Sequence, residues 1–358
     1  MPIILKNLTA DQLQARLAPL GVTPRMARQI QAAVLQRGTW LAPQPGLSAR
    51  VLENVRRATV IPHLKLHSKV ISPQDGFAKY LFSGDGPDLF EAVSIPLLHR
   101  ANDAKCIVCV SCQAGCALGC AFCATGRMGF RRNLAAWEIV DQVAAIRADS
   151  PYPVRGVVFM GMGEPMLNYE AVIQAAHIMS EPCGLAIAGK AITISTAGIV
   201  PGIRRFTAEG HSYRLVVSLT SADPGLRRAL MPVEQAHPLA DIMPALREYH
   251  AATRRRVTLA WTMLAGINTR ARDVRQLADL IGDLPVKLDL IDVNDPTGRF
   301  RPPSPEELAA FRDVLRTTLK APVARRYSGG RDISAACGML AGKSPDSSGE
   351  SRRKATAC

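Results

Sequence analysis

The residues best suited to chemistry in this sequence of 358 residues are a run of thiols in its first half. Six of the nine cysteines fall within eighteen consecutive residues: Cys106, Cys109, Cys112, Cys116, Cys120 and Cys123. Cysteines that only fill a core behave as small hydrophobic residues and are scattered along a chain. In a reducing compartment, clustered thiols are expected to bind metal or to act in catalysis before they form structural disulfides.

Three interpretations of this run compete. A ferredoxin-like cluster would use its first four thiols, whose spacing matches the four-cysteine run of bacterial ferredoxins. A structural zinc site would use any four of the six. The third interpretation uses only Cys116, Cys120 and Cys123, which form a C-x3-C-x2-C loop.

Local geometry favours the three-cysteine loop. Residues 105–111 have the pattern of a strand, which would point Cys106 and Cys109 to opposite faces. The ferredoxin run normally closes with Cys-Pro, whereas Cys116 is followed by Ala117, and the separated ligand hairpins typical of zinc sites are absent from the sequence. Three thiolates on a [4Fe-4S] cluster leave one iron open to chelate S-adenosylmethionine. Its reductive cleavage would give methionine and a 5′-deoxyadenosyl radical.

A second candidate motif, Gly161-Met-Gly163-Glu164-Pro165, follows an apolar strand. Its glycines allow close backbone approach, and its carboxylate can receive the methionine ammonium group. Ser195 and Ser218 end two later strands, where hydroxyl groups can bond the ribose or the carboxylate. Each feature alone is also typical of an ordinary turn or cap.

These motifs need a parallel sheet to bring them together, and the sequence from residue 104 alternates strand and helix patterns. The expected strands are 105–110, 156–160, 191–195, 215–219, 257–264 and 286–291, and the expected helices are 134–148, 169–180, 239–252, 271–281 and 305–319. The strands are short apolar runs typical of burial on both faces. Six units are too few for an eight-stranded barrel, so we expect an incomplete barrel or an open sheet with its chemistry at the C-terminal strand ends.

Composition and charge divide the rest of the chain. Residues 1–60 carry helical patterns over 11–20, 24–35 and 48–59, with eight basic and two acidic side chains, and are expected to form a basic accessory domain that binds RNA or is only solvated. Residues 61–103 are expected to form a hairpin extension, 104–342 the core and 343–358 a disordered tail.

The whole-chain composition excludes several classes of protein. The net charge is +14 and 47% of residues are hydrophobic, which excludes a disordered chain, a collagen and a coiled coil. No run of about 18 apolar residues predicts a membrane span, and the N-terminus lacks the order of a signal peptide. We therefore expect a cytoplasmic protein with no membrane partner.

The cysteine region CVSCQAGCALGCAFCATGRMGFRRN (109–133) resembles that of the RlmN/Cfr family of radical SAM RNA methyltransferases. Further blocks follow in the family's order: EAVSIP (91–96), GMGEPMLN (161–168), ITISTAGIVP (192–201), VSL (217–219), LDLIDVN (288–294) and DISAACGML (332–340). The resemblance covers roughly residues 60–342. It implies an incomplete (β/α)6 radical SAM barrel with a [4Fe-4S] cluster and S-adenosylmethionine as cofactors.

The resemblance also implies roles for individual residues. Cys337 matches the cysteine that carries the methyl group, Cys109 the thiol that resolves it through a transient disulfide with Cys337, and Glu91 the proton acceptor. The implied S-adenosylmethionine contacts are Gly163, Glu164, Ser195, Ser218, Leu219, Thr220 and Asn294. The implied partners are RNA, with 23S ribosomal RNA favoured and transfer RNA as a second target, and an electron donor such as flavodoxin or ferredoxin; the protein is expected to be a monomer.

Two departures and several alternatives stay open at this stage. Thr220 stands where the family commonly has His, and acidic residues flank Asn294. The favoured target atom is C2 of adenosine, with C8 as the alternative. A radical SAM enzyme acting on a peptide or small molecule, and a non-catalytic iron–sulfur or zinc protein that binds RNA, are the rival functions.

Overall fold

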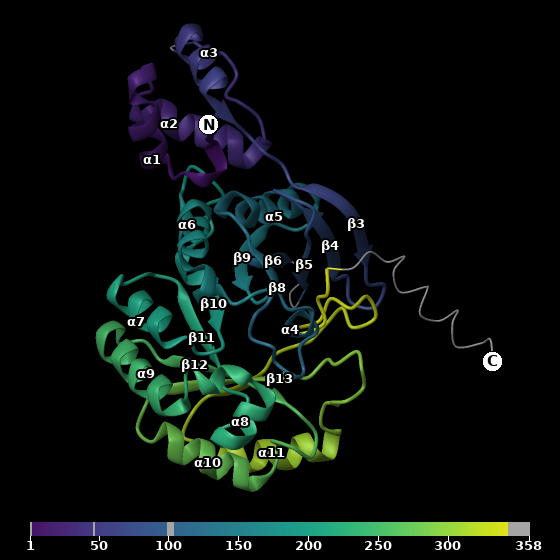
Figure 1. Ribbon diagram of the computed structural model, residues 1–358. Helices are drawn as coiled ribbons and strands as arrows, with labels where there is room; N and C mark the ends of the chain where they lie inside the picture. Colours follow the sequence, from purple (N-terminus) through teal and green to yellow (C-terminus); the bar gives the residue numbers. More distant parts are fainter. Residues whose placement is uncertain (1, 46, 99–103, 343–358) are drawn as a thin grey trace, which may run out of the picture.

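A ten-stranded sheet forms the centre of the protein in a computed structural model that describes residues 2–45, 47–98 and 104–342 (Figure 1). In sheet order its strands are β14 (Val323–Arg325), β13 (Val286–Asp292), β12 (Val257–Met263), β11 (Arg214–Ser218), β10 (Ile192–Thr196), β9 (Val154–Phe159), β6 (Lys105–Cys109), β5 (Leu89–Leu97), β4 (Ala78–Ser83) and β3 (Lys65–Ile71). The seven strands from β14 to β6 run parallel. The predicted α/β fold with six βα units is confirmed, and β14 adds a short seventh parallel strand.

Helices alternate with these strands and cover the outside of the sheet (Figure 1). They are α4 (Ala124–Met128), α5 (Ala136–Asp149), α6 (Tyr169–Ser180), α7 (Val200–Ala208), α8 (Pro224–Leu230), α9 (Leu239–Thr253), α10 (Ala271–Ile281) and α11 (Pro305–Thr318). Three of them, α4, α7 and α8, are short and were not expected from the sequence. Among the described residues, no helix has both the length and the apolar character needed to cross a membrane.

The expected hairpin is a three-stranded antiparallel extension of the same sheet. β4 pairs with β3 and β5, and β5 continues onto β6, from Val93 opposite Cys109 to Leu97 opposite Lys105. β3 lies at the sheet edge with mostly exposed side chains, so its sequence lacks the alternation that predicts a half-buried strand. Because β5 is hydrogen-bonded to β6, Glu91 on β5 belongs to the sheet that carries the thiols.

The first sixty residues form the helices α1 (Ala10–Leu17), α2 (Pro24–Arg37) and α3 (Ala49–Ala58) at one end of the molecule, near α5 and α6 (Figure 1). Each helix begins after a hydroxyl side chain (Thr9, Thr23 and Ser48) that accepts a hydrogen bond from a backbone N–H of the first turn. A short pairing of β1 (Ile3–Ile4) with β2 (Thr59–Val60) closes this unit. The expected tail, 343–358, lies outside the described residues.

A buried ion pair joins this helical unit to the sheet domain. Lys6 is 1% exposed, and its Nζ lies 2.6 Å from Oδ1 of Asp141 on α5. Lys6 also donates to the Pro62 carbonyl, while the second Asp141 oxygen accepts from the Leu64 backbone at 2.7 Å. Burial lowers the pKa of Lys6, and the Asp141 carboxylate opposes that shift.

We expect Lys6→Ala to destabilise the protein by about 3 to 5 kcal/mol, because it leaves the Asp141 carboxylate buried without its cation. Lys6→Met/Asp141→Leu should lose less than the sum of the two single changes. Arg57→Ala, which removes an exposed pair with Glu53, is the control and should cost about 0.5 kcal/mol or less. Urea unfolding of these three variants and of the two single changes, Lys6→Met and Asp141→Leu, measures these differences, and a loss below 1 kcal/mol for Lys6→Ala would show that the pair does not hold the two parts together.

Candidate active site

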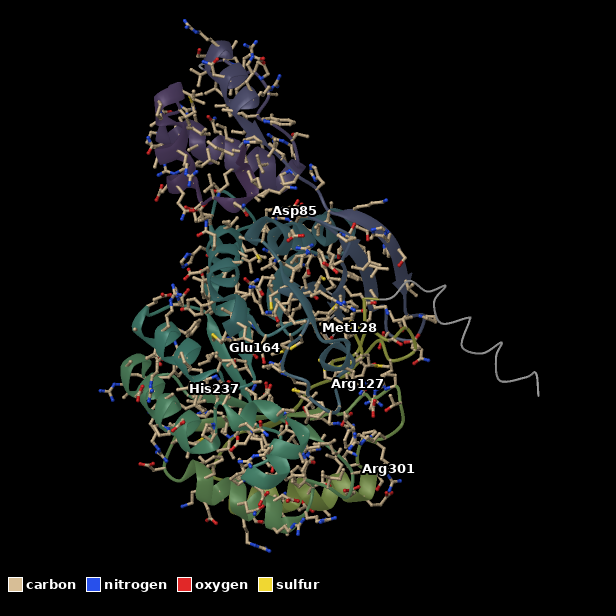
Figure 2. The ribbon with its side chains drawn as sticks, viewed as in Figure 1. Asp85, Arg127, Met128, Glu164, His237 and Arg301 are labelled. Carbon is tan, nitrogen blue, oxygen red and sulfur yellow. The ribbon has the colours of Figure 1, made fainter. Side chains whose placement is uncertain are left out.

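A cavity opens at the C-terminal ends of the parallel strands, and most of the predicted site residues line it. They are Cys116, Cys120, Cys123, Gly163, Glu164, Ser195, Ser218, Asn294 and Cys337. The residues come from the cysteine loop, from the turn after β9, from the ends of β10 and β11, and from the chain after β13 and β14. Figure 2 shows Glu164 near the middle of the molecule, with Arg127 and Met128 of α4 in the same region. Convergence at this edge is the arrangement expected for a parallel sheet.

Two predicted contacts, Leu219 and Thr220, lie behind the wall of this cavity. Both are fully buried, and neither is among the residues that line it. The Thr220 carbonyl accepts a hydrogen bond from Asn268 Nδ2 at 2.7 Å, so this carbonyl is already engaged within the protein. Thr220 has a φ of 61°, and its buried hydroxyl has no partner among the described residues.

The three cysteines of the C-x3-C-x2-C loop lie on one side of the cavity. Backbone bonds fix the loop: Cys116 N–H donates to the Gly129 carbonyl and Ala121 N–H to the Leu230 carbonyl. Burial raises the pKa of the Cys116 thiol to about 12 and raises that of Cys120 as well. Thiolates at these positions therefore need a cation beside them, which the irons of a cluster would supply.

The spacing of these thiols is relevant to the zinc interpretation. Within the described ranges, no three His, Cys, Asp or Glu side chains are grouped closely enough to hold one metal ion. In an iron–sulfur cluster each thiolate binds a different iron, so its ligands need not converge on one point. The loop thus fits a cluster held by Cys116, Cys120 and Cys123.

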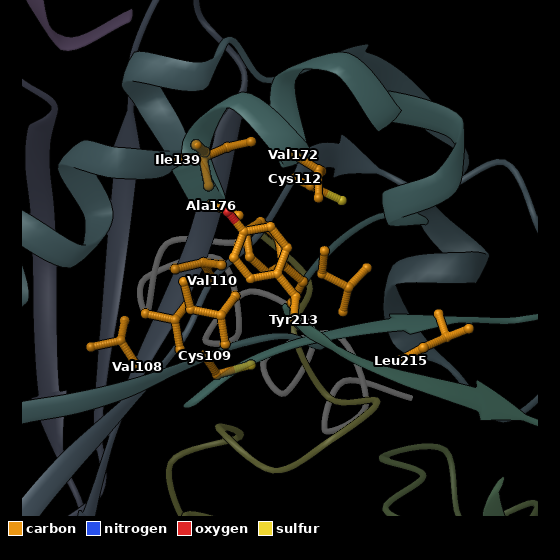
Figure 3. Close-up of a cluster of buried hydrophobic side chains, with 14 of the residues drawn as sticks. Val108, Cys109, Val110, Cys112, Ile139, Val172, Ala176, Tyr213 and Leu215 are labelled. Atoms are coloured by element: carbon orange, nitrogen blue, oxygen red, sulfur yellow. The ribbon is translucent and has the colours of Figure 1, made fainter. Parts of the chain in front are cut away.

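The earlier cysteines of the run are not gathered with this loop, which contradicts the ferredoxin-like interpretation. Cys106 is fully buried and lies 3.1 Å from the Ser94 hydroxyl, while Cys109 faces the barrel interior. Cys112 is buried among apolar side chains that include Ile139 and Val172 (Figure 3). As expected, the side chains of Cys106 and Cys109 on β6 point to opposite faces of the sheet.

Glu164 lies buried in the cavity wall and is fixed by backbone donors. Its two carboxylate oxygens accept from Met166 N–H at 3.0 Å and from Ala197 N–H at 2.8 Å. Burial raises the pKa of Glu164, and these hydrogen bonds oppose the shift. A buried carboxylate that faces a cavity is a suitable partner for an ammonium group such as that of methionine.

Polar groups on the later strands complete the wall. The hydroxyl groups of Ser195 and Ser218 have no hydrogen-bond partner in the described part of the chain, which leaves them available to a ligand. Asn294 donates from Nδ2 to the carbonyls of Asp292 at 3.0 Å and Cys337 at 3.3 Å. Asn294 therefore also holds the segment that carries Cys337. These donors and acceptors fit a polar nucleoside and amino-acid ligand such as S-adenosylmethionine.

Cys337 and Cys109 line the same inner cavities, and both are free thiols. Cys337 is open to solvent through these cavities, whereas Cys109 is only 6% exposed. Burial raises the pKa of the Cys109 thiol, and the nearby Cys337 raises it further. Desolvation raises the pKa of Cys337 too, but the Arg326 guanidinium opposes that shift. The two sulfurs thus line the same cavities, but Cys337 is more accessible to solvent than Cys109.

Arg326 is a site residue that the motifs did not identify. It follows β14 and lines a cavity together with both thiols. Its Nε donates to Asp289 Oδ2 at 2.8 Å, and one terminal nitrogen lies 3.1 Å from Met160 Sδ. In the sequence it is one of three arginines shortly before Cys337, with Arg325 and Arg331, a group that suits a polyanion and does not single out Arg326.

Glu91 lies beneath the segment that follows Cys337 and is not among the residues lining the cavities. Its Oε2 accepts from the backbone of Ala341 at 2.7 Å and of Gly342 at 3.1 Å, and its Oε1 lies 3.0 Å from Lys79 Nζ. The structure therefore links Glu91 to the Cys337 segment by hydrogen bonds.

The acidic residues around Asn294 hold basic residues near the cavity. Asp292 Oδ2 accepts from Arg325 at 2.7 Å and from Arg331 at 3.2 Å, and Asp295 pairs with Arg127 of α4 at 3.2 Å. The side chains of the three arginines are between one third and one half exposed. The departure from the family pattern therefore holds a group of arginines, here called the basic rim, beside the segment 292–294 that lines the cavity.

Comparisons with known proteins agree with this architecture. The sequence model of the radical SAM superfamily matches residues 110–281. A probable RNA methyltransferase of Myxococcus xanthus is 47% identical, with 94% of each chain covered. A dual-specificity RNA methyltransferase RlmN of Syntrophobacter fumaroxidans is 38% identical over 95% of this chain and 98% of its own. The crystal structure of a radical SAM methyltransferase from Sphaerobacter thermophilus superposes with a TM-score of 0.85 and 35% identity, covering 96% of this chain and all of that one.

Replacing Cys116, Cys120 or Cys123 by Ala should abolish binding of the [4Fe-4S] cluster, because each thiolate would hold one iron. Iron and sulfide analysis of anaerobically reconstituted protein measures the loss. Cys106→Ala and Cys112→Ala are matched controls from the same run and should retain the cluster. Loss of iron from both controls, with retention in Cys120→Ala, would reverse the assignment.

Glu164→Gln should weaken binding of S-adenosylmethionine roughly 10- to 100-fold, since it removes the charge that receives the ammonium group. Equilibrium dialysis with the cluster-loaded protein gives the two dissociation constants. Glu170→Gln, a change on exposed α6 surface, should bind as the unmodified protein does. Equal affinity in Glu164→Gln would place the ammonium group elsewhere.

Proposed function

Because the chain belongs to the RlmN-type family of radical SAM RNA methyltransferases, we propose that it methylates C2 of an adenosine in 23S ribosomal RNA by way of a methylated cysteine. The observation that carries this proposal is the pair of thiols, Cys337 and Cys109, facing the same cavities beside the cofactor site. A radical SAM enzyme acting on a peptide or small molecule has no need of such a pair.

The chemistry divides between the cofactors and the protein. When bound, the cluster and S-adenosylmethionine supply a methyl group, an electron and a carbon radical. Cys337 accepts the methyl group on its sulfur, which requires the thiolate form. Desolvation raises the pKa of the Cys337 thiol, and the nearby Arg326 guanidinium opposes that shift and so helps the thiolate to form.

Cys337 then carries the carbon that joins the adenine ring. After that bond has formed, Glu91 takes the proton from the ring carbon, and Cys109 attacks the Cys337 sulfur. The attack breaks the bond between sulfur and the methylene carbon, and that carbon takes up a proton to become the methyl group of the product. The unpaired electron left by the radical addition would return to the cluster, so that a disulfide between the two cysteines remains. Glu91 is held by Ala341 and Gly342 N–H groups, so we infer that this segment moves aside when RNA binds.

RNA recognition would rest on charge and on extrusion of the target base. The basic rim of Arg127, Arg325 and Arg331 lies beside the segment 292–295 at the cavity, and helices α1 to α3 add further basic surface. Contacts from these side chains to phosphates would give affinity that falls with rising salt. The adenine has to leave its stack to enter the cavity, as in other enzymes that modify bases. We further propose that a flavodoxin or ferredoxin donates the electron and that the protein acts as a monomer.

Nucleoside analysis of ribosomal RNA tests the proposed activity directly. RNA incubated with the anaerobic enzyme, a reductant and S-adenosylmethionine should yield 2-methyladenosine. Transfer RNA treated in the same way shows whether a second substrate is used. Formation of 8-methyladenosine would correct the target atom, and no methylated adenosine in either RNA would refute the proposal.

Variants of the two thiols should fail at different stages. Cys337→Ala loses the acceptor and should give no methylated RNA, although the cluster still binds. Cys109→Ala should accumulate a covalent protein–RNA adduct, because the carbon–carbon bond forms and the bond to sulfur cannot be broken. Glu91→Gln should also accumulate an adduct, since the ring proton cannot leave. Denaturing gels before and after nuclease treatment show the adduct.

Cys183→Ala is the control for these variants, since Cys183 donates to Gln31 far from the cavities. It should methylate RNA as the unmodified protein does. Normal turnover by Cys109→Ala would remove Cys109 from the mechanism, and Cys109→Ala/Cys112→Ala would then show whether Cys112 had replaced it.

A further inference from the structure

A second cavity runs through the inside of the barrel and links the two thiols to the opposite end of the sheet. At one end it is lined by Cys109 and Cys337. At the other it is lined by cationic residues at or near the starts of four parallel strands: Lys105, Arg155, Lys190 and Arg214. This end is remote from the C-terminal strand ends, where the cofactor residues lie.

The strand register shows that thiol and cation share one wall. Cys109 on β6 lies opposite Val158 on β9, which lies opposite Thr193 on β10, which lies opposite Arg214 on β11. All four residues line this cavity. Adjacent strands are separated by about 4.8 Å, so three steps span about 14 Å. The cations therefore lie on the same wall as the thiols and can attract an anion into the cavity that leads to the sulfurs.

The charge of this cavity is strongly one-sided. Among the described residues, five cationic side chains line it, of which Arg326 is paired with Asp289, against a single carboxylate, Asp75. Asp75 is already engaged by the Tyr327 hydroxyl at 3.1 Å and the Gly330 N–H at 2.8 Å. Within the described ranges, the side chains of Arg155, Lys190 and Arg214 form no ion pair or hydrogen bond. A ligand that binds in this cavity is thus expected to be an anion.

We infer that this cavity admits a small anionic thiol, which reduces the Cys109–Cys337 disulfide after each turnover. The inference rests on the proposed function, because that chemistry leaves the disulfide. It assigns the basic end of the barrel to a ligand distinct from S-adenosylmethionine and from the target adenine.

The reduction balances as two thiol–disulfide exchanges. A first thiolate attacks the Cys337 sulfur, the bond between the two cysteines breaks, and Cys109 leaves as a thiolate. A second thiolate attacks the mixed disulfide, which releases Cys337 as a thiolate and the two small thiols as their own disulfide. The two small thiols supply the two electrons. Cys337 is the more accessible sulfur, and Arg326 lies beside both thiolates that are released.

The test compares three thiols of nearly equal size and different charge. The full-length protein is oxidised until peptide mass spectrometry identifies the Cys109–Cys337 disulfide. Its reduction is then followed with 2-mercaptoethanesulfonate, 2-mercaptoethanol and cysteamine, each rate being expressed per thiolate. At low salt, the anionic thiol should react roughly tenfold or more faster than the cationic one, with the neutral thiol between them. High salt should reduce the difference.

Variants of the cationic side chains test whether they cause the preference for the anionic thiol. Arg155→Glu/Lys190→Glu/Arg214→Glu should reverse the preference, and the same three positions changed to Gln should abolish it even where the reversed variant fails to fold. Arg275→Glu/Arg312→Glu/Lys320→Glu makes an equal change of net charge at exposed positions that line none of the described cavities and should keep the preference.

The outcomes separate this inference from the proposed function. If oxidation yields no disulfide between Cys109 and Cys337, the proposed resolving step fails and the inference fails with it. If the disulfide forms and the three thiols reduce it at equal rates, only the inference is overturned. If the Gln variant loses RNA affinity and keeps the thiol preference, the basic end binds RNA, which also overturns the inference.

Discussion

Close backbone contact between residues 110–113 and 161–163 is the constraint on which the active site depends. Gly161 N–H donates to the Val110 carbonyl at 3.1 Å, and Cys112 N–H donates to the Met162 carbonyl at 2.9 Å. A Cβ atom at Gly163, where φ is 102°, would lie 2.6 Å from the Cβ of Gln113. The contact therefore exists only because residue 163 has no side chain. It fixes the start of the cysteine loop against the turn that carries Glu164, so the cluster ligands and the partner of the methionine ammonium group are set by one piece of backbone.

The segment 337–342 depends on this frame and connects it to the rest of the site. Its backbone bonds to Asn294 after β13, to Ala124 at the start of α4, and to Glu91 on β5. The proposed carrier and the proposed proton acceptor are therefore mechanically coupled, since moving the end of the segment would free Oε2 of Glu91 while Oε1 stays paired with Lys79. A substrate that displaces this end would expose the base only when RNA is present, which protects the methylated cysteine from reacting without its target.

Short-range patterns were sufficient to predict the six central strands, the longer helices, the cysteine loop and the turn at Gly163–Glu164, because buried parallel strands are apolar and motif residues follow them directly. Asn294 and Cys337 were indicated by the resemblance alone. Leu219 and Thr220 do not line the cavity, and a strand pattern does not show that the chain turns behind the wall after Ser218. The position of Arg326 beside the thiols could not be predicted either, because it depends on β14, a strand of three residues that is too short to show a periodic pattern. The pairing of β5 with β6 likewise follows from tertiary contacts that no local pattern encodes.

Access to the cofactor cavity distinguishes the two thiols of the proposed mechanism. They share the inner cavities and the guanidinium of Arg326, so local charge does not separate them. Burial raises the pKa of both thiols, and a protonated thiol neither accepts a methyl group nor attacks sulfur. Of the two, Cys337 alone also lines the cofactor cavity, so a bound cofactor reaches its sulfur first. Cys109 can then react only with the Cys337 sulfur, which faces the same inner cavities. The order of the two sulfur steps in the proposed mechanism thus follows from the unequal access of the two cysteines to the cofactor.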